Sequence, residues 1–318
     1  MYKKRLLLPF ILILFAFILT GCIIFDNTST HEVQQLLQDK GTKSQQETVK
    51  KSETVSLTIN YIDVGQGDSI FIQTPSGKTM LIDAGTSEMG SKVENYIKSR
   101  GINKIDILIG THPHNDHIGG IVEVIKTFKI GKFYMPKVMT TTKTFEEVLK
   151  AAKSKGLSIN VAKAGVVIDL EDGIIAKMLA PNSSHYEDLN NYSAVVKITY
   201  GNTSFLFTGD AGEQSEKEML SEGYNLKADV LKIGHHGSSS ASTWAFLKAV
   251  HPKYAVISCG RYNDYGHPHK EIMKKLRSLG IIVYRTDECG TVIAVSDGET
   301  INFNVEPGDY LSGSEIKR

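Results

Sequence analysis

The chain has 318 residues, 41% of them hydrophobic, and its 36 basic residues are balanced by 35 acidic ones. This apolar content is enough for one large folded domain. The balanced charge excludes a positive field over the whole surface, of the kind that attracts polyanions without a defined site. The 3 cysteines are too few for a zinc ribbon, and we expect Cys259 and Cys289 to be unpaired thiols at neighbouring strand ends.

The N-terminal segment has the charge order of a secretory signal. Three basic residues at 3–5 precede an apolar run over 6–19 that is short for a membrane span. The Leu-Thr-Gly sequence before Cys22 resembles the lipobox of bacterial lipoproteins, in which the cysteine is lipidated and becomes the new N-terminus. We therefore predict a signal peptide over 1–21, a lipid anchor on Cys22 and an extracytoplasmic location at the cell membrane. An uncleaved anchor that continues to residue 25 is the alternative, and it places the rest of the chain on the same side.

The segment after Cys22 is polar. Residues 22–54 are rich in Thr, Ser, Gln, Lys and Glu, so they cannot bury enough apolar surface to offset the entropy cost of ordering. We predict that this lipidated segment is a flexible tether. The folded domain is predicted over 55–318.

Short β-branched runs and amphipathic stretches alternate through this domain. It opens with strands at 56–63, 69–73 and 79–83, then a helix at 89–99, a buried strand at 105–109 and helices at 118–128 and 144–155. Strands come next at 166–170, 174–179, 194–200 and 204–208. The last part reads as a helix at 213–222, a strand at 229–233, a helix at 242–250, a strand at 254–258, a helix at 270–279 and strands at 281–285 and 291–295. Two mixed β-sheets packed face to face, with helices outside, accommodate this order.

Lysines far outnumber acidic residues in the segment 121–165. Such a local charge would hold a polyanion through phosphate contacts. An ordinary solvated helix face has the same composition, and the sequence leaves both interpretations open.

The densest group of ligand-type side chains follows the strand predicted at 105–109. Within six residues the loop holds His112, His114, Asp116 and His117. Imidazole nitrogen and carboxylate oxygen suit zinc, manganese or iron. We expect His112 and His114 to serve one cation, and Asp116 and His117 to serve another. Clustered His and Asp beside apolar residues need a reason, so we predict a metal centre here.

This His-x-His-x-Asp-His motif resembles the signature of the metallo-β-lactamase superfamily, which implies an α/β fold, the αββα sandwich. The resemblance implies that Asp83, at the end of an earlier strand, orients a histidine ligand, and that Asp210 bridges two metal ions. It also implies that His235 or His236 is the last ligand. Two divalent ions, zinc or manganese, would then activate a water for attack on a phosphoester.

The chain departs from the superfamily pattern at one ligand. The usual third histidine, expected between His117 and Asp210, is not clearly present. His185 lies in a polar loop. Asn191 and Ser193 lie in the segment that, in related sequences, occupies the region of the missing histidine. We favour a surface position for His185, which would leave the first metal ion weakly held.

Further segments narrow the resemblance to the extracytoplasmic hydrolase domain of ComEC-type DNA-uptake competence proteins. They are the stretches 63–69, 231–238 and 263–269, and the likeness extends over 55–295. Because the spanning segments of that channel are missing, we expect a free-standing domain.

Supporting and catalytic roles are assigned around these motifs. Asp63 and Asp68 are expected behind the ligands, where Asp68 would cap or brace a tight turn at two glycines, Gly65 and Gly67. If His235 is the ligand, His236 would donate a proton or contact a phosphoryl oxygen. His267, in a Gly-His-Pro turn, would face the cleft as a substrate contact. The expected catalytic set is therefore Asp116, His236 and His267. Arg285 fits either a position near the cleft or a surface salt bridge.

Two enzymatic functions and one binding function fit the sequence. The first is a phosphodiesterase or nuclease that acts on DNA outside the membrane, in connection with competence. The second is a cell-wall enzyme that cleaves teichoic-acid phosphodiesters or phosphocholine esters. The third is a non-catalytic module that presents DNA or another polymer to a channel. β-Lactamase activity is disfavoured, and a monomer is the default expectation.

Overall fold

The computed structural model describes residues 56–316. The predictions of a signal peptide over 1–21, of lipidation at Cys22 and of a tether over 22–54 lie outside the described residues. Across 56–316, no helix is both long and apolar enough to cross a bilayer.

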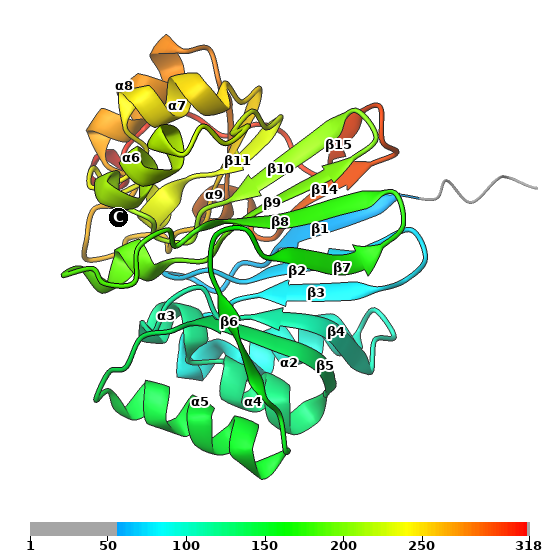
Figure 1. Ribbon diagram of the computed structural model, residues 1–318. Coiled ribbons are helices and arrows are strands. Elements are labelled where there is room, and N and C mark those ends of the chain that lie inside the picture. The colour runs from blue at the N-terminus through cyan, green and yellow to red at the C-terminus, as the bar shows by residue number, and fades with distance from the viewer. Residues whose placement is uncertain (1–55, 317–318) are drawn as a thin grey trace, which may run out of the picture. The chain divides into compact units, whose positions relative to one another are not determined.

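Two β-sheets pack face to face, with helices on their outer faces (Figure 1). The eight-stranded sheet has the order β15-β14-β1-β2-β3-β4-β5-β6, and the seven-stranded sheet has the order β13-β12-β11-β10-β9-β8-β7. The strands of the first sheet are β1 (Leu57–Tyr61), β2 (Ile70–Gln73), β3 (Thr79–Ile82), β4 (Lys104–Ile109), β5 (Lys129–Pro136), β6 (Ile159–Ala162), β14 (Val292–Ser296) and β15 (Ile301–Phe303). Those of the second are β7 (Val167–Glu171), β8 (Ile174–Ala180), β9 (Val195–Tyr200), β10 (Thr203–Phe207), β11 (Val230–Lys232), β12 (Tyr254–Ile257) and β13 (Ile282–Arg285).

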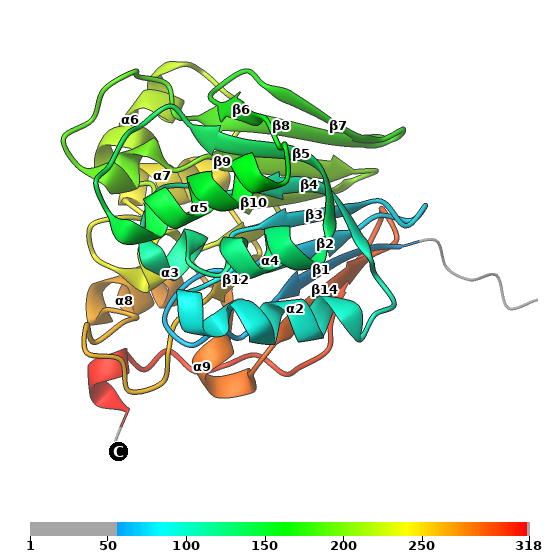
Figure 2. The same ribbon diagram turned by 90° about the horizontal axis from the view of Figure 1, so that it is seen from below.

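The helices divide between the two outer faces. Those on the eight-stranded sheet are α2 (Gly90–Lys98), α4 (Ile121–Thr127) and α5 (Lys143–Ser154), as Figure 2 shows. Those on the seven-stranded sheet are α6 (Glu213–Ser221), α7 (Trp244–Val250) and α8 (Lys270–Ser278). Short turns of helix lie in the loops: α3 (Asn115–Ile118), α9 (Thr286–Cys289), η1 (Ser87–Met89), η2 (Leu189–Tyr192), η3 (Gly234–Gly237) and η4 (Gly313–Glu315).

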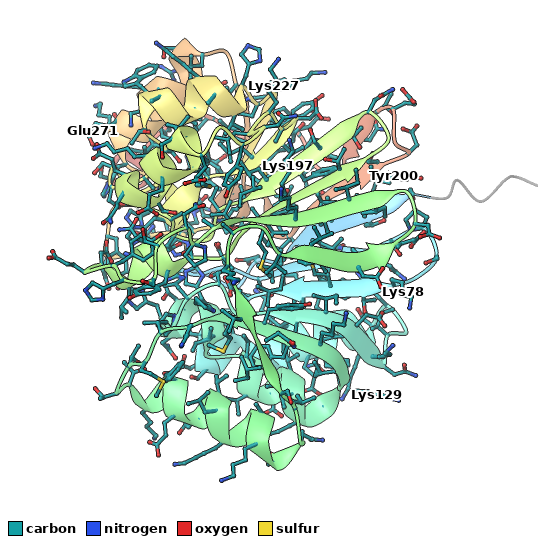
Figure 3. All side chains as sticks on the ribbon, in the orientation of Figure 1. Lys78, Lys129, Lys197, Tyr200, Lys227 and Glu271 are labelled. Atoms are coloured by element: carbon teal, nitrogen blue, oxygen red, sulfur yellow. The ribbon has the colours of Figure 1, made fainter. Side chains whose placement is uncertain are left out.

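Apolar side chains on both faces of the central strands explain this layering. In β3, Met80 and Ile82 point into the layer between the sheets, whereas Leu81 packs under the helices. This alternation follows from the two-residue period of a strand, and burial on both faces requires a continuous apolar run. Charged side chains such as Lys78 and Lys129 lie on the outside (Figure 3). The predicted αββα sandwich is confirmed.

The parallel part of each sheet positions the polar loops. Strands β3 to β6 are parallel, and so are β10 to β13. Their carboxyl ends lie at one edge of each sheet, which is where ligand sites form in such folds. The predicted site residues of 83–117 follow β3 and β4, and those of 210–236 follow β10 and β11.

Several predicted elements need correction. Strands β5 and β6 were not predicted, because β5 begins with exposed Lys and Gly and β6 is a short edge strand with exposed side chains. The exposed strand β15 and the short helix α9 were also not predicted. The helix predicted at 118–128 is divided into α3 and α4 by Gly119 and Gly120. A Cβ on either glycine would come within 2.3 and 2.2 Å of neighbouring backbone atoms. Cys259 and Cys289 are free thiols, as expected.

Candidate metal centre

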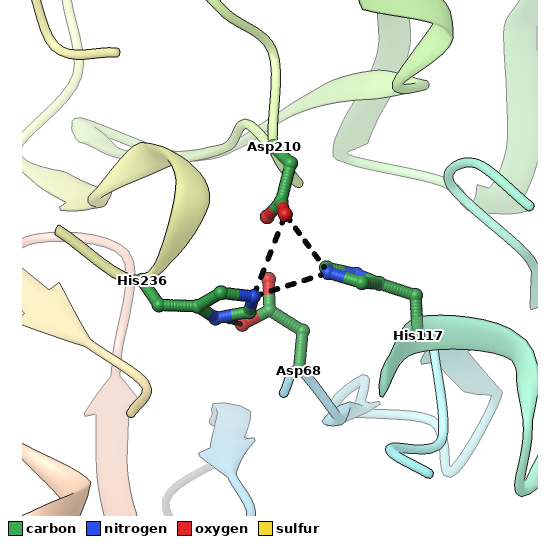
Figure 4. A group of neighbouring side chains, drawn as sticks. All are labelled: Asp68, His117, Asp210 and His236. Atoms are coloured by element: carbon green, nitrogen blue, oxygen red, sulfur yellow. Dashed lines mark hydrogen bonds and ion pairs between the residues drawn. The ribbon is translucent and has the colours of Figure 1, made fainter. Parts of the chain in front are cut away.

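Four imidazoles surround one carboxylate oxygen between the two sheets. The Oδ2 atom of Asp210, just after β10, lies 3.2, 3.4, 3.7 and 3.9 Å from ring nitrogens of His117, His236, His235 and His112 respectively. Two of these histidines come from the loop after β4 and two from the loop after β11. The structure therefore brings the sequence-distant halves of the predicted site together around Asp210 (Figure 4).

Four donor atoms form what we call the inner cluster: Nε2 of His117, Nε2 of His236, Oδ2 of Asp116 and Oδ2 of Asp210. The two nitrogens are 3.3 Å apart, and His236 Nε2 lies 3.3 Å from Asp116. His117 Nε2 lies 3.9 Å from the same Asp116 oxygen. Two donors bound at about 2.1 Å to one tetrahedral zinc ion would be about 3.4 Å apart. The spacing of the inner cluster fits one such ion.

Hydrogen bonds at the far side of each ring turn the Nε2 lone pairs toward the inner cluster. His117 Nδ1 donates to Asp83 Oδ2 at 2.8 Å, and His236 Nδ1 donates to the Ser258 carbonyl at 3.0 Å. Asp83 also accepts from the amide and hydroxyl of Thr111, which fixes the start of the histidine loop. A carboxylate or carbonyl behind a histidine is the usual support for a metal ligand.

The buried carboxylate of Asp210 gives an independent test of fit for a cation. Among the described residues, its Oδ1 atom has no hydrogen-bond partner although the side chain is 2% exposed. An unpaired buried acceptor is costly, and a metal ion would use it. The residues present therefore fit a divalent ion, and the Oδ1 atom of Asp210 is available as a ligand.

Three further histidines, which we call the flanking histidines, lie beside the inner cluster: His112, His114 and His235. His112 Nε2 lies 2.9 Å from His114 Nδ1, and Nδ1 of His112 contacts the hydroxyls of Thr111 and Ser193. His235 turns Nδ1 to Ser240 Oγ at 2.9 Å and Nε2 toward Asp210. The rings of His112 and His235 thus lie beside Asp210, and the ring of His114 adjoins His112.

The electrostatics of the metal-free site show the same demand for positive charge. Burial would lower the pKa of His117, but nearby carboxylates, chiefly Asp210 and Asp83, outweigh it and raise that pKa well above its usual value. The pKa of His236 is raised in the same way, again mainly by Asp210. Burial would raise the pKa of Asp210, yet protonated His117 and His236 hold it well below its usual range. The two imidazolium groups therefore occupy the role that a cation would fill.

Asp68 and Lys232 form a buried ion pair below His236. Their charged atoms are 2.8 Å apart, and neither side chain is more than 1% exposed. The other oxygen of Asp68 lies 3.3 Å from His236 Nδ1, so Asp68 supports that ring from behind. One donor atom from each of Asp68, His117, Asp210 and His236 lies within 4.8 Å of the others. We assign Asp116 as the fourth donor instead, because Asp68 is neutralised by Lys232 and faces Nδ1.

Lys232 is the functional residue that the sequence analysis missed. A lysine within the apolar stretch 230–233, three positions before His235, was the available signal. Asp68 was expected to brace the glycine turn, and its carboxylate instead reaches across to Lys232 and His236.

The mouth of the site is lined by residues of four loops. Gln66, His114, Asn115, His235, Tyr265 and His267 surround it. The ring of His267 stacks on Tyr265, and its Nδ1 lies 3.3 Å from Gln66 Nε2, which donates to it. Burial and the neighbouring imidazoles lower the pKa of His267 to about 3. His267 is therefore neutral at neutral pH, and its Nε2 carries the proton.

Three residues named in the sequence analysis lie apart from the donors. Asp63 accepts from the Gly65 amide and pairs with Lys92, so it supports the turn and not a ligand. His185 is exposed. Arg285 is fully buried against Asp287, so the interpretation as a surface salt bridge is wrong.

Unusual backbone conformations concentrate at the site. Asp83, His235 and His236 have φ values of 58, 51 and 55°, which non-glycine residues adopt at a cost that functional sites often store. Because His235 and His236 both have left-handed backbone angles, their adjacent imidazoles can face the same carboxylate, that of Asp210. Gly67 has φ of 142°, and a Cβ there would lie 2.3 Å from the Asp116 carbonyl oxygen. The glycine turn therefore packs directly on the ligand loop.

Comparisons with known proteins agree with this class of fold and site. The chain belongs to the metallo-β-lactamase superfamily, whose family model matches residues 62–261, and we class it as a metal-dependent hydrolase of that superfamily. It is 35% identical to ComE operon protein 3 of Bacillus subtilis, over 78% of this chain and 34% of that protein. It is 30% identical to competence protein ComA of Neisseria gonorrhoeae, over 72% of this chain and 31% of that one.

The chain thus spans about a third of the length of these curated relatives. Among solved structures, the metallo-β-lactamase fold protein YhfI of Bacillus subtilis aligns with a TM-score of 0.47 at 14% identity, over 72% of this chain and 96% of that one.

Proposed function

We propose that this protein is a two-metal phosphodiesterase that cleaves DNA. The observation that carries the proposal is the position of Asp210, between donors from both sheets and with one buried oxygen left free. The names of its relatives refer to competence, which is the reason to choose DNA among phosphodiesters. We propose that it acts as a monomer, as expected from the sequence.

The donors divide between two ions. Asp116, His117, Asp210 and His236 would hold one ion, and Asp210 with the flanking histidines His112, His114 and His235 would hold the other. When bound, a pair of divalent ions activates a water and neutralises charge on a phosphoryl group. Zinc and manganese both suit nitrogen and carboxylate oxygen donors.

His267 has a distinct role in this proposal. Because its pKa is about 3, it cannot act as an imidazolium acid at neutral pH. Its Nε2–H would instead donate a hydrogen bond to a phosphoryl or leaving oxygen, with Gln66 fixing the tautomer through Nδ1. His236 belongs to the ion-binding set, so His267 takes over the substrate contact that the sequence analysis divided between them.

Hydrolysis of bis-p-nitrophenyl phosphate by the purified protein tests the proposal. We expect turnover with zinc or manganese, no turnover with chelator, and loss of at least about a hundredfold for His112→Ala. His185→Ala, a histidine of the exposed loop, is the matched control and should retain full turnover. Absence of turnover with any metal, despite stoichiometric binding, would reject a phosphodiesterase.

Cleavage of teichoic-acid phosphodiesters is a second enzymatic function that would use the same phosphodiester chemistry. Teichoic acids are phosphodiester polymers of the cell wall, which a lipid-anchored enzyme would meet first. We propose that the protein is anchored through Cys22 on the extracytoplasmic face. Cys22→Ala should then move it from the membrane pellet to the soluble fraction, and an unchanged distribution would reject the anchor.

A further inference from the structure

A groove lies at the carboxyl ends of β5 and β6, and we call it the lysine groove. One half carries the two lysines, and its polar side chains are those of Lys137, Lys163, Asn182, Ser183, Ser184 and Tyr192. Its apolar half is lined by Met135, Pro136, Val138, Met139, Phe145 and Leu149. Lys137 and Val161 line both halves, so the two hollows adjoin at these side chains.

Two connections place the lysine groove beside the metal centre. Tyr192 in the groove precedes Ser193, whose hydroxyl lies 3.3 Å from His112 Nδ1. On the other side, the chain from Lys137 leads to Thr144, whose hydroxyl donates to Asn115 at 3.1 Å. Asn115 lines the mouth of the metal centre. The lysine groove and the mouth of the metal centre are therefore joined by stretches of chain on both sides.

Some lysines of the segment 121–165 form ion pairs with acidic side chains, and others do not. On α5, Lys143 and Lys150 pair with Glu147 and Glu146, and these account for the solvated helix face. Over the part of the chain that the structure describes, Lys137 and Lys163 have no acidic partner. Both are exposed and face one groove. Two of the lysines of 121–165 that have no acidic partner among the described residues therefore line the groove.

On the wall formed by Asn182 and Ser183, the polar groups are hydrogen-bonded within the protein. The Tyr186 hydroxyl accepts from the amides of Asn182 and Ser183 and donates to Glu218. The Ser183 hydroxyl also donates to Glu218, at 2.8 Å. These groups are occupied within the protein, and the two lysines are the positively charged side chains that line the groove.

The apolar half limits which anion fits. Met139 is 80% exposed and Val161 is 46% exposed, and large apolar side chains gathered on a surface indicate a binding site. A nucleotide carries a phosphate for the lysines and a flat base for the apolar side. Bases are free to make such contacts only in a single strand. A poly(glycerol phosphate) chain offers phosphates alone.

We propose that the lysine groove holds single-stranded nucleic acid next to the nucleotide at the metal centre, with phosphates on Lys137 and Lys163 and a base over Met139 and Val161. This inference rests on the proposed phosphodiesterase function and adds that the substrate is single-stranded at the groove. It favours nucleic acid over the teichoic-acid alternative.

Binding of a fluorescent oligothymidylate to the full-length protein, in chelator and at several salt concentrations, tests the lysines. Each phosphate contact on a single strand contributes about 0.7 to the slope of log Kd against log salt, so Lys137→Ala/Lys163→Ala should lower the slope by about 1.4. The control is Lys129→Ala/Lys132→Ala, in the exposed first part of β5, which should leave the slope unchanged. Equal slopes for wild type and the groove variant, or an equal drop in the control, would overturn the proposal.

A second measurement tests the base contact. Met139→Ser should weaken oligothymidylate binding about fivefold and leave binding of a blunt duplex of the same length unchanged. Poly(glycerol phosphate) should compete poorly with oligothymidylate. If it competes equally and Met139→Ser has no effect, the groove binds polyphosphate chains without bases and the proposal is wrong. Binding is measured in chelator, where we expect no turnover, so the two proposals can fail separately. Oligothymidylate binding as expected, without cleavage under any metal condition, would reject the phosphodiesterase function and support the binding groove.

Discussion

His235 supplies an imidazole beside Asp210 in a chain that lacks a clear third histidine of the superfamily pattern. The sequence offers only His185 between His117 and Asp210, and that residue is exposed. His235 reaches the same carboxylate from the loop after β11, with Nε2 at 3.7 Å from Asp210 and Nδ1 held by Ser240. A left-handed backbone at His235 makes this direction available.

The stoichiometry of bound metal should depend on His235. We expect wild type to bind two zinc ions and His235→Ala to bind one tightly, because the inner cluster stays intact. Native mass spectrometry after dialysis against limiting chelator measures the count. His185→Ala is the control and should bind two. Two tightly held ions in His235→Ala would contradict the assignment.

Protons should leave the inner cluster when metal binds. The pKa values of His117 and His236 are raised well above the usual histidine value, so the metal-free protein favours the protonated form of these rings. Metal requires their Nε2 lone pairs, and its apparent affinity should therefore rise as pH rises toward those pKa values. Calorimetry in buffers of different ionisation enthalpy should count about two released protons. His236→Gln should release one fewer, and equal release in both proteins would count against this account.

At the scale of elements, the turn between β1 and β2 acts on the ligand loop through backbone contact. The Asp68 amide donates to the Asp116 carbonyl at 3.1 Å, and Gly67 leaves no room for a side chain. A change in this turn is therefore transmitted to Asp116.

Gly67→Ala should weaken metal binding more than it weakens the fold. We expect a loss of about 2 kcal/mol in the free energy of unfolding from backbone strain, and at least a tenfold loss of zinc affinity because Asp116 must move. Gly77→Ala is the matched control, since Gly77 also has a positive φ of 86° but faces open space. Urea unfolding and zinc titration measure the two effects, and equal zinc affinities in both variants would exclude the contact.

Strand β11 carries a charge that only a partner from the other sheet can neutralise. Lys232 and Asp68 are both buried, and removal of one member of a buried pair typically costs about 3–5 kcal/mol. Lys232→Met should lose about that much stability in urea without metal. Lys232→Met/Asp68→Asn should recover part of the loss, because no unpaired charge remains. Strictly additive losses would show that the pair does not couple the sheets.

For the whole molecule, short-range signals were sufficient for most strands and helices and for the ligand loop. The αββα arrangement was implied by the resemblance to the superfamily, and the His112 to His117 loop is a local motif. What the sequence could not provide was contact across the sheets. Lys232 reads as an irregularity in an apolar run until Asp68 is placed beside it. The choice between His235 and His236 depends on backbone angles that adjacent, identical residues do not reveal.

Edge strands were the other gap in the prediction. The side chains of β6 are mostly exposed, so the apolar periodicity that identifies a buried strand is weak there. Lys137 and Lys163 follow β5 and β6, and without those strands nothing in the sequence placed the two lysines in one groove.

The division of donors between two sheets also has a consequence for how the protein acquires its ions. During synthesis the loop with His117 is complete long before Asp210 and His236 exist, so a growing chain carries half a site with nothing to close it. Half a site holds an ion poorly, and closure requires that the two sheets have met. Metal loading is then the last step of folding. The compartment in which folding finishes, and the metal pool of that compartment, decide which ion the protein carries.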